Sequence, residues 1–238
     1  MLRAHLRAAI ALSTILLDIE GTTTPIAFVH DVLFSYARAR VQEFLDGHGA
    51  ELAVAADIAL LRAEHAAETS PPPMASVAAY VRWLMDRDSK STSLKSLQGK
   101  IWALGYQAGD LHGEVYPDVP PALERWRRHG IEVAIFSSGS VQAQRDLFAS
   151  TAEGDLTRFI RAYFDTNTGP KTAVESYTRI AAALDRSASD VLFVSDIEAE
   201  LNAAQAAGMQ TALCVRSPER ARPSGGHAVV HTFDQFPG

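Results

Sequence analysis

The chain has 238 residues, of which 47% are hydrophobic, and its formal net charge of −6 gives a pI near 5.7. This length suffices for an α/β core with an inserted second unit, and the acidic balance offers no general attraction for nucleic acid. No run of about 20 apolar residues is present to span a membrane. The apolar stretch after Arg3 and Arg7 continues into an acidic residue without a convincing cleavage site, so we do not expect a signal peptide. The single cysteine, Cys214, is expected in the core, in keeping with a reducing cytoplasm.

The first predicted element is a buried strand over Ser13 to Leu17, which stops at Asp18. From Pro25 to about Leu111 the apolar residues recur at helical spacing, and no strand signal occurs. The helical pattern is interrupted at Gly47, at Gly49 and at the proline run 71–73. The helices are expected at 28–45, 51–67, 74–86 and 93–107. An all-helical insertion directly after the first strand is therefore predicted.

Beyond Tyr116 the pattern alternates between helix and strand, which predicts a doubly wound parallel sheet. The expected helices are 119–129, 141–149, 172–184 and 198–207; the expected strands are 131–136, 162–164, 191–195 and 210–215. The tail from residue 217 onward is rich in glycine, proline and polar residues, with one edge strand expected at 228–231. We predict an α/β core formed by residues 1–24 and 112–238, interrupted by a helical domain of residues 25–111.

Two acidic residues, Asp18 and Glu20, follow the first predicted strand immediately. In an open α/β sheet, ligands bind at the carboxyl ends of the strands. Two carboxylates two residues apart can hold a divalent cation, which would let Asp18 approach a phosphate that it would otherwise repel. The segment predicts nucleophilic phosphoryl transfer, although such a pair taken alone is also typical of a helix cap or a solvated turn.

Further polar side chains follow the later strands and turns. Ser137 and Ser138 come after the strand 131–136, where hydroxyls and backbone N–H groups at a helix N-terminus can hold a phosphate. Lys171 follows a Gly-Pro turn and supplies a compact positive charge. Asp196 follows the strand 191–195. The order of nucleophile, hydroxyl, lysine and second carboxylate resembles the four motifs of the haloacid dehalogenase (HAD) superfamily.

Within that superfamily the chain resembles the enolase-phosphatase family of methionine salvage, also called acireductone synthase, from about Leu12 to Val215. The segments that carry the resemblance are 18–26 (DIEGTTTPI), 30–34 (HDVLF), 97–102 (LQGKIW), 137–144 (SSGSVQAQ) and 164–166 (FDT). Glu20 is the most specific of these positions, because most HAD phosphatases have aspartate there and the halide-releasing members have an uncharged residue.

The resemblance implies a HAD-like core with an inserted helical cap. It implies a monomeric enzyme that uses one Mg²⁺ per chain, held by Asp18, Glu20 and Asp196. Asp18 is the expected nucleophile, and Glu20 is assigned first to the metal and second to acid/base catalysis. Ser137, Ser138 and Lys171 are expected to bind the substrate phosphate. The implied substrate is a phosphorylated diketone, 2,3-diketo-5-methylthiopentyl 1-phosphate, which is enolised and then dephosphorylated to the acireductone.

Two other functions are weighed against this one. A general phosphatase for a sugar or glycolate phosphate would share the same chemistry. A phosphate-responsive receiver module also combines strand-end aspartates with a lysine, but the helical insertion and Glu20 disfavour it.

Several other residues are given structural roles. His30 is expected mainly as a surface histidine, and Trp83, Trp102 and Trp126 as core residues. Glu198 and Glu200 could extend the acidic end of the site, but they are interpreted first as favourable charges in the first turn of a helix.

Overall fold

The computed structural model describes residues 12–70, 72–73, 75–87, 89, 91–217 and 226–236. They form two compact units. One consists of the residues up to Ile26 and from Gly113 onward, and the other is the segment Ala27–His112 inserted between them. The sequence-based division placed the breaks after residues 24 and 111. No helix among the described residues is long and apolar enough to cross a membrane.

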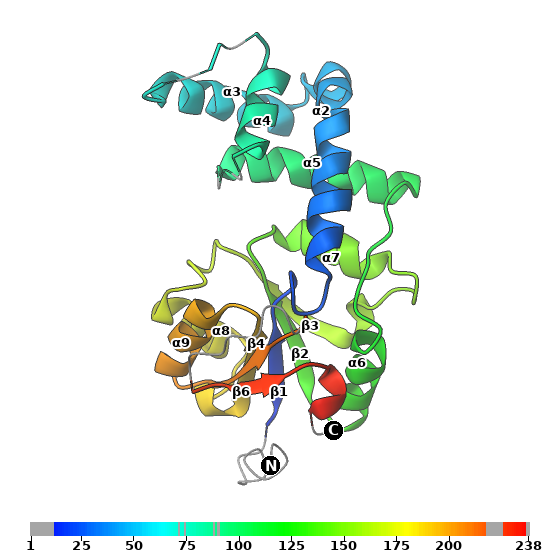
Figure 1. Ribbon diagram of the computed structural model, residues 1–238, viewed down its shortest axis with the longest axis vertical. Helices are drawn as coiled ribbons and strands as arrows, with labels where there is room; N and C mark the ends of the chain where they lie inside the picture. The colour runs from blue at the N-terminus through cyan, green and yellow to red at the C-terminus, as the bar shows by residue number, and fades with distance from the viewer. Residues whose placement is uncertain are drawn as a thin grey trace. The chain divides into compact units, whose positions relative to one another are not determined.

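The first unit is built on a six-stranded sheet in the order β3-β2-β1-β4-β5-β6, in which every neighbouring pair is parallel (Figure 1). The strands are β1 (Thr14–Leu17), β2 (Glu132–Phe136), β3 (Ile160–Phe164), β4 (Val191–Ser195), β5 (Gln210–Cys214) and β6 (Ala228–Val230). The predicted doubly wound parallel sheet is confirmed. The edge strand expected in the C-terminal tail is present as β6, which pairs with β5.

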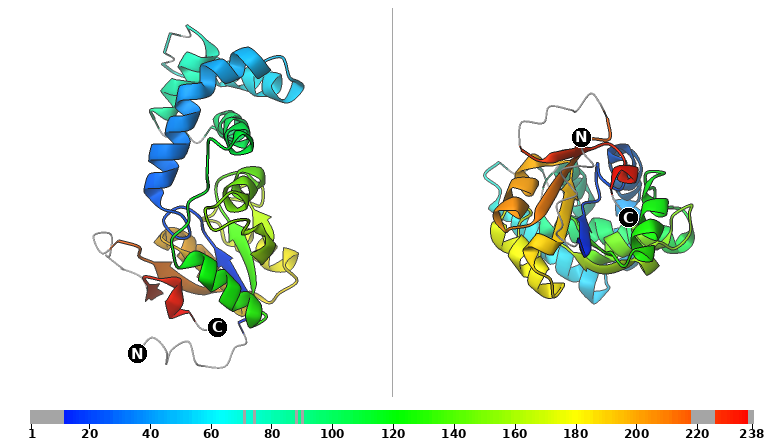
Figure 2. Two further views of the ribbon diagram at one scale, coloured as in Figure 1. Left: turned by 90° about the vertical axis from the view of Figure 1, so that its right-hand side faces the viewer. Right: turned by 90° about the horizontal axis from the view of Figure 1, so that it is seen from below.

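Helices cover both faces of this sheet, with α8 and α9 on one side and α6 and α7 on the other (Figure 2). Their bounds are α6 (Val119–Arg128), α7 (Val141–Ala149), α8 (Val174–Ala183) and α9 (Glu198–Ala206). Every residue of β1 is buried, as is typical of a central strand covered on both faces, and the three residues after Thr14 are aliphatic. On the α8 and α9 side, the core contains the fully buried Tyr177, Phe193 and Leu201. Each such side chain contributes about 1.5–3 kcal/mol by leaving water.

One boundary differs from the prediction in a way that concerns the site. Helix α8 begins at Val174 and not at Thr172. The carbonyl of Pro170 accepts hydrogen bonds from the Ala173 amide at 3.0 Å and from the Ser176 hydroxyl at 2.8 Å. These bonds hold residues 170–173 in a turn, so Lys171 lies on a loop ahead of the helix.

In the second unit the described residues contain helices and no strands. The elements are the π-helix η1 (Phe28–Phe34), α2 (Ser35–His48), α3 (Leu52–Ala67), α4 (Val77–Met85) and α5 (Thr92–Ala108). The hydroxyls of Ser76 and Ser91 accept from the backbone at the starts of α4 and α5, which is why α4 begins after the predicted position. The predicted first residue of that helix, Met74, lies outside the described residues.

The three tryptophans have the expected structural positions. Trp126 is fully buried in the first unit and contacts the rings of Phe233 and Phe236. Trp83 and Trp102 are partly buried and pack against the core of the second unit.

Register along the sheet determines where the polar residues lie. Leu17, the last residue of β1, pairs with Ile135 of β2 and with Val194 of β4. The three strands therefore end side by side, next to the point where the chain order reverses between β1 and β4. This is where an open α/β sheet places its ligands.

Candidate active site

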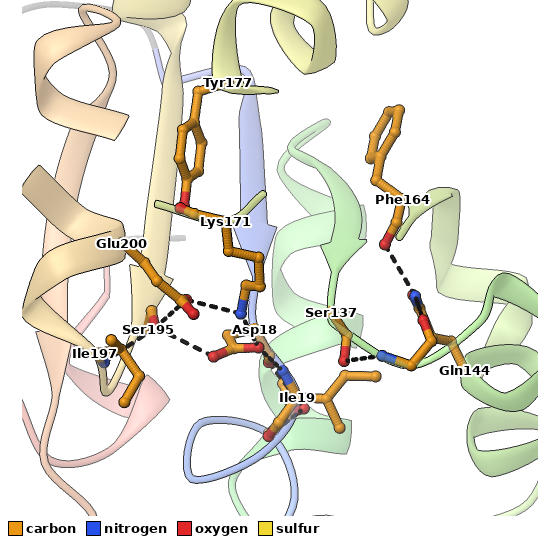
Figure 3. A network of polar contacts seen from close by, with 12 residues as sticks. Asp18, Ile19, Ser137, Gln144, Phe164, Lys171, Tyr177, Ser195, Ile197 and Glu200 are labelled. Carbon is orange, nitrogen blue, oxygen red and sulfur yellow. Dashed lines mark hydrogen bonds and ion pairs between the residues drawn. The ribbon is translucent and has the colours of Figure 1, made fainter. Parts of the chain in front are cut away.

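The carboxylate of Asp18 is held at the carboxyl end of β1 and is only 5% exposed. Its Oδ1 accepts a hydrogen bond from the Ile19 amide at 2.8 Å and lies 2.6 Å from the ammonium of Lys171. Its Oδ2 accepts from the Ser195 hydroxyl at 3.1 Å (Figure 3). Donors on both oxygens fix the orientation of the carboxylate, which is what a nucleophile needs before it meets its substrate.

The loop after Asp18 folds back tightly on itself. The carbonyl of Ile19 accepts from the amides of residues 22–24 at 2.9–3.1 Å, and the Gly21 amide donates to the Thr24 carbonyl at 2.9 Å. Gly21 has φ of 71°, a conformation that favours glycine. A Cβ at this residue would lie 2.3 Å from Oδ2 of Asp196, so the missing side chain is what lets the loop approach that carboxylate.

Lys171 joins two buried carboxylates. Its ammonium is 2.6 Å from Asp18 and 2.7 Å from Oε2 of Glu200, and its side chain is only 10% exposed. The Tyr177 hydroxyl donates to the Lys171 carbonyl at 2.6 Å and so anchors the loop that carries the lysine. Burial by itself lowers the pKa of Lys171, but the negative charges of Asp18 and Glu200 outweigh it, and the pKa is raised above its ordinary value. The lysine is therefore a permanent cation in this site.

Glu200 is a site residue that the sequence interpretation underrated. It lies in the first turn of α9, as expected, but it is buried and does more than favour the helix dipole. Its carboxylate pairs with Lys171 and accepts from the Ser195 hydroxyl at 3.0 Å. Burial and the charge of Asp18 raise the pKa of Glu200, while Lys171 acts in the opposite direction. The signal that could have identified it is its spacing, four residues after Asp196 at the start of a helix.

Ser195 connects the two carboxylates that Lys171 also bridges. Its hydroxyl lies within hydrogen-bond distance of both Asp18 and Glu200, and it accepts from the Ile197 amide at 3.1 Å. A hydroxyl has a single proton, so it can donate to only one of the two carboxylates at a time. Figure 3 shows Lys171 and Ser195 forming the two links between Asp18 and Glu200.

The two predicted phosphate-binding serines follow β2, the strand next to β1. Ser137 is partly buried, and its Oγ accepts from the Gly139 amide at 3.3 Å. Ser138 is exposed. The hydroxyl of Ser140 caps α7 by accepting from the Ala143 amide at 3.2 Å. Ser140 is therefore the N-cap of α7, and Ser137 and Ser138 lie ahead of the helix N-terminus.

Asp196 follows β4 and completes the acidic edge of the site. Burial, followed by the charges of Asp18 and Glu200, raises the pKa of Asp196 to about 7. Several carboxylates thus share a buried region in which Lys171 supplies a single positive charge.

The donor set suits a hard divalent cation. No three acidic, histidine or cysteine side chains among the described residues are close enough to form a ready-made metal site, so Asp18, Glu20 and Asp196 are not preassembled. Mg²⁺, however, usually takes one or two carboxylates and completes its shell with water and substrate oxygens. Asp18 and Asp196 provide oxygen donors of this kind, and a cation would offset the burial and the repulsion from Asp18 and Glu200 that together raise the pKa of Asp196.

Comparison with known proteins agrees with this geometry. The sequence model of the haloacid dehalogenase-like hydrolases matches residues 12–208. The enolase-phosphatase E1 of Synechococcus elongatus is 51% identical over 234 residues, which cover 95% of this chain and 98% of that protein. The chain belongs to the enolase-phosphatase family. As a member of this family it is a phosphatase, a hydrolase of phosphoric monoesters.

A second curated relative and two solved structures also span nearly the whole chain. The enolase-phosphatase E1 of Sorangium cellulosum is 47% identical over 96% of this chain and 99% of its own length. The UTR4 protein of Saccharomyces cerevisiae has a crystal structure that superposes with a TM-score of 0.76, at 33% identity, over 94% of this chain and 100% of that one. CbbY of Rhodobacter sphaeroides, at 14% identity and a TM-score of 0.58, shares the fold.

Proposed function

We propose that this enolase-phosphatase converts 2,3-diketo-5-methylthiopentyl 1-phosphate to the acireductone and inorganic phosphate, as a step of methionine salvage. The observation that carries the proposal is the buried Asp18–Lys171 pair at the carboxyl end of β1. Both carboxylate oxygens of Asp18 also accept a hydrogen bond, Oδ1 from the Ile19 amide and Oδ2 from the Ser195 hydroxyl. The identity to enolase-phosphatases over nearly the whole chain supports the choice of substrate.

In the phosphatase step, a carboxylate oxygen of Asp18 attacks phosphorus in line with the departing oxygen. The new bond is an acyl phosphate on Asp18, and the P–O bond that breaks leaves its electron pair on the enol oxygen, which takes up a proton. Water then attacks the same phosphorus, which releases inorganic phosphate and restores the carboxylate. We assign Glu20 to the metal first and to this proton transfer second, because its longer side chain suits either role.

The phosphate is bound by the residues around Asp18. Lys171 contacts the attacking carboxylate directly, so its ammonium lies within reach of an anion placed against that oxygen. Ser137 and Ser138 supply hydroxyl groups ahead of α7, and Ser138 also supplies its backbone N–H, since the Ser137 N–H already donates to the Phe164 carbonyl at 3.1 Å. The helix dipole also favours an anion at this position. Together they give the phosphoryl oxygens donors that are fixed before the substrate arrives.

We assign one Mg²⁺ per chain to Asp18, Asp196 and Glu20. When bound, the ion supplies positive charge to the phosphoryl oxygens and to the substrate carbonyl that enolises. We further propose that the enzyme acts as a monomer in the cytoplasm. The buried, unpaired thiol of Cys214, whose pKa is raised by burial to about 12, suits a reducing compartment.

The substrate assignment is tested by incubating the purified protein with the diketone phosphate under anaerobic conditions. We expect release of phosphate together with the ultraviolet absorbance of the acireductone. A panel containing glycolate phosphate and several sugar phosphates serves as the comparison. If kcat/KM for any of these exceeds that for the diketone phosphate, the protein is a more general phosphatase and the proposed substrate is wrong.

The metal assignment predicts that Asp196→Asn raises the Mg²⁺ concentration needed for half-maximal activity by about ten- to a hundredfold. The amide keeps the shape of the side chain but loses its charge. Activity is measured against Mg²⁺ concentration after chelator treatment, with Asp190→Asn, a change at a half-buried aspartate just before β4, as the matched control. An unchanged Mg²⁺ dependence in Asp196→Asn, or full activity of the wild type in excess chelator, would contradict the assignment.

A further inference from the structure

A buried arginine outside the predicted motifs holds the loop that follows Asp18. Arg216 lies two residues after β5, and its side chain is only 8% exposed. Its Nε and Nη2 both donate to the carbonyl oxygen of Thr22, at 2.9 and 2.7 Å. Thr22 belongs to the loop 19–24, so this contact links the end of one strand to the loop after another.

The rest of the guanidinium is equally well fixed. Its Nη1 pairs with Oδ2 of Asp118 at 2.6 Å and donates to the His231 carbonyl at 3.3 Å. Its centre lies 4.3 Å from the Tyr116 ring and 4.5 Å from the Phe233 ring. The guanidinium is planar, lies against two aromatic rings and donates hydrogen bonds from all three of its nitrogens. It therefore has very little freedom to move.

The C-terminal segment 226–236 completes this arrangement, although its sequence suggested no role. The amide of Phe233 donates to the same Asp118 carboxylate that pairs with Arg216, at 2.5 Å. Phe233 is fully buried, and its carbonyl accepts from Nη2 of Arg125 at 2.6 Å. The tail is thereby attached to the core at the place where the arginine is held.

The loop 19–24 is therefore fixed on two sides. On one side the Thr22 carbonyl is bound by Arg216 and the Thr23 carbonyl accepts from the Tyr116 amide at 2.9 Å. On the other side Gly21 is so close to Asp196 that a Cβ would overlap Oδ2 of that carboxylate. A shift of the Thr22 carbonyl would move Gly21 and its neighbour Glu20 relative to Asp196.

We infer that Arg216 is a positioning residue for the active site: the two hydrogen bonds from its guanidinium to the Thr22 carbonyl set where Glu20 lies relative to Asp18 and Asp196. This inference rests on the proposed function of those carboxylates as metal ligands. The aromatic rings and the Asp118 carboxylate keep the guanidinium in place, and the C-terminal segment supplies one of the rings.

The test must separate positioning from simple stability. Removing Arg216 alone leaves the buried Asp118 without its counter-ion, which can unfold the protein. The informative variant is therefore Arg216→Gln/Asp118→Asn, in which both charges are gone and the asparagine can still accept from the Phe233 amide. The matched control is Arg125→Met, which loses a hydrogen bond from an arginine to the C-terminal segment without touching the loop.

Two measurements on the full-length proteins decide the question. In Arg216→Gln/Asp118→Asn we expect backbone amides 19–24 to exchange hydrogen at least about tenfold faster than in the wild type. We expect calorimetric titration with Mg²⁺ alone to show a dissociation constant about ten- to a hundredfold higher. In Arg125→Met we expect both quantities to match the wild type even where the melting temperature falls.

The inference would be overturned if the double variant showed wild-type hydrogen exchange at residues 19–24 and wild-type Mg²⁺ affinity. It would also be overturned if Arg125→Met changed both quantities as much as the double variant does. Failure of the proposed function is distinguishable from this result. A wild-type protein that binds no Mg²⁺ and turns over no diketone phosphate refutes the proposed function, while the exchange of residues 19–24 still decides whether Arg216 positions the loop.

Discussion

Replacing Asp18 by asparagine is expected to lower phosphate release by at least about a thousandfold and to leave the fold intact. The amide oxygen can still accept from Ile19 and Lys171, and the NH₂ group can donate to the Ser195 oxygen, so the side chain keeps its place. It has no negative charge with which to attack phosphorus. Phosphate release at saturating substrate measures the effect, and a melting curve checks the fold.

The control for this variant is Asp155→Asn, which changes a carboxylate in the turn before β3 that accepts from Thr157. Its activity should equal that of the wild type. Phosphatase activity of Asp18→Asn within tenfold of the wild type would show that another group is the nucleophile.

The same variant should separate the two reactions. Enolisation moves a proton from C1 of the substrate to a carbonyl oxygen, which requires a base but no nucleophile. Phosphoryl transfer requires the Asp18 nucleophile. We therefore expect Asp18→Asn to convert the diketone phosphate into an enol phosphate that accumulates, visible by phosphorus NMR and ultraviolet absorbance without oxygen. If calorimetry shows that the variant binds substrate and yet leaves the diketone unchanged, Asp18 also takes part in proton transfer.

The second large effect is expected from Lys171→Met. This change removes the only cation paired with Asp18 and Glu200 among the described residues, so two buried carboxylates lose their counter-ion. Breaking such a buried pair costs about 3–5 kcal/mol of the free energy of unfolding. We expect phosphatase activity to fall at least about a hundredfold, because the phosphate also loses its fixed cation.

A second variant separates these two effects. In Lys171→Met/Glu200→Gln one of the two carboxylates is neutral, so we expect much of the lost stability to return while activity stays low. Arg186→Met is the control, since it breaks an ion pair with Glu132 at the opposite end of β2. It should lower the melting temperature without lowering kcat. Recovery of activity in the double variant would show that Lys171 acts only by neutralising Glu200.

The parallel sheet, and the polar residues at its carboxyl edge, could be predicted because their signals are local. Continuous apolar runs identify central strands such as β1 and β4, and the polar residue that follows each run then falls at one edge of the sheet. Asp18 and Lys171 are in direct contact, which agrees with the motif order. The roles of Ser137, Ser138, Glu20 and Asp196 remain predictions that the variants above address.

Other features depend on contacts between distant residues, which a single sequence does not reveal. Glu200 has the pattern of an ordinary first-turn acid, and only the fold places Lys171 against it. Likewise, nothing local connects Arg216 with Thr22 or Asp118. The π-helix η1 escaped prediction because the apolar spacing of residues 28–34 does not separate it from an α-helix.

The most direct test of Asp18 as the nucleophile is to trap the phosphorylated enzyme. Wild-type protein is mixed with the diketone phosphate, quenched in acid within the first turnover, digested, and analysed by mass spectrometry. We predict that one phosphoryl group is found on the peptide containing Asp18, that it is lost on treatment with hydroxylamine as an acyl phosphate must be, and that Asp18→Asn shows none. A phosphoryl group on any other residue, or an unmodified enzyme during rapid turnover, would contradict the proposed mechanism.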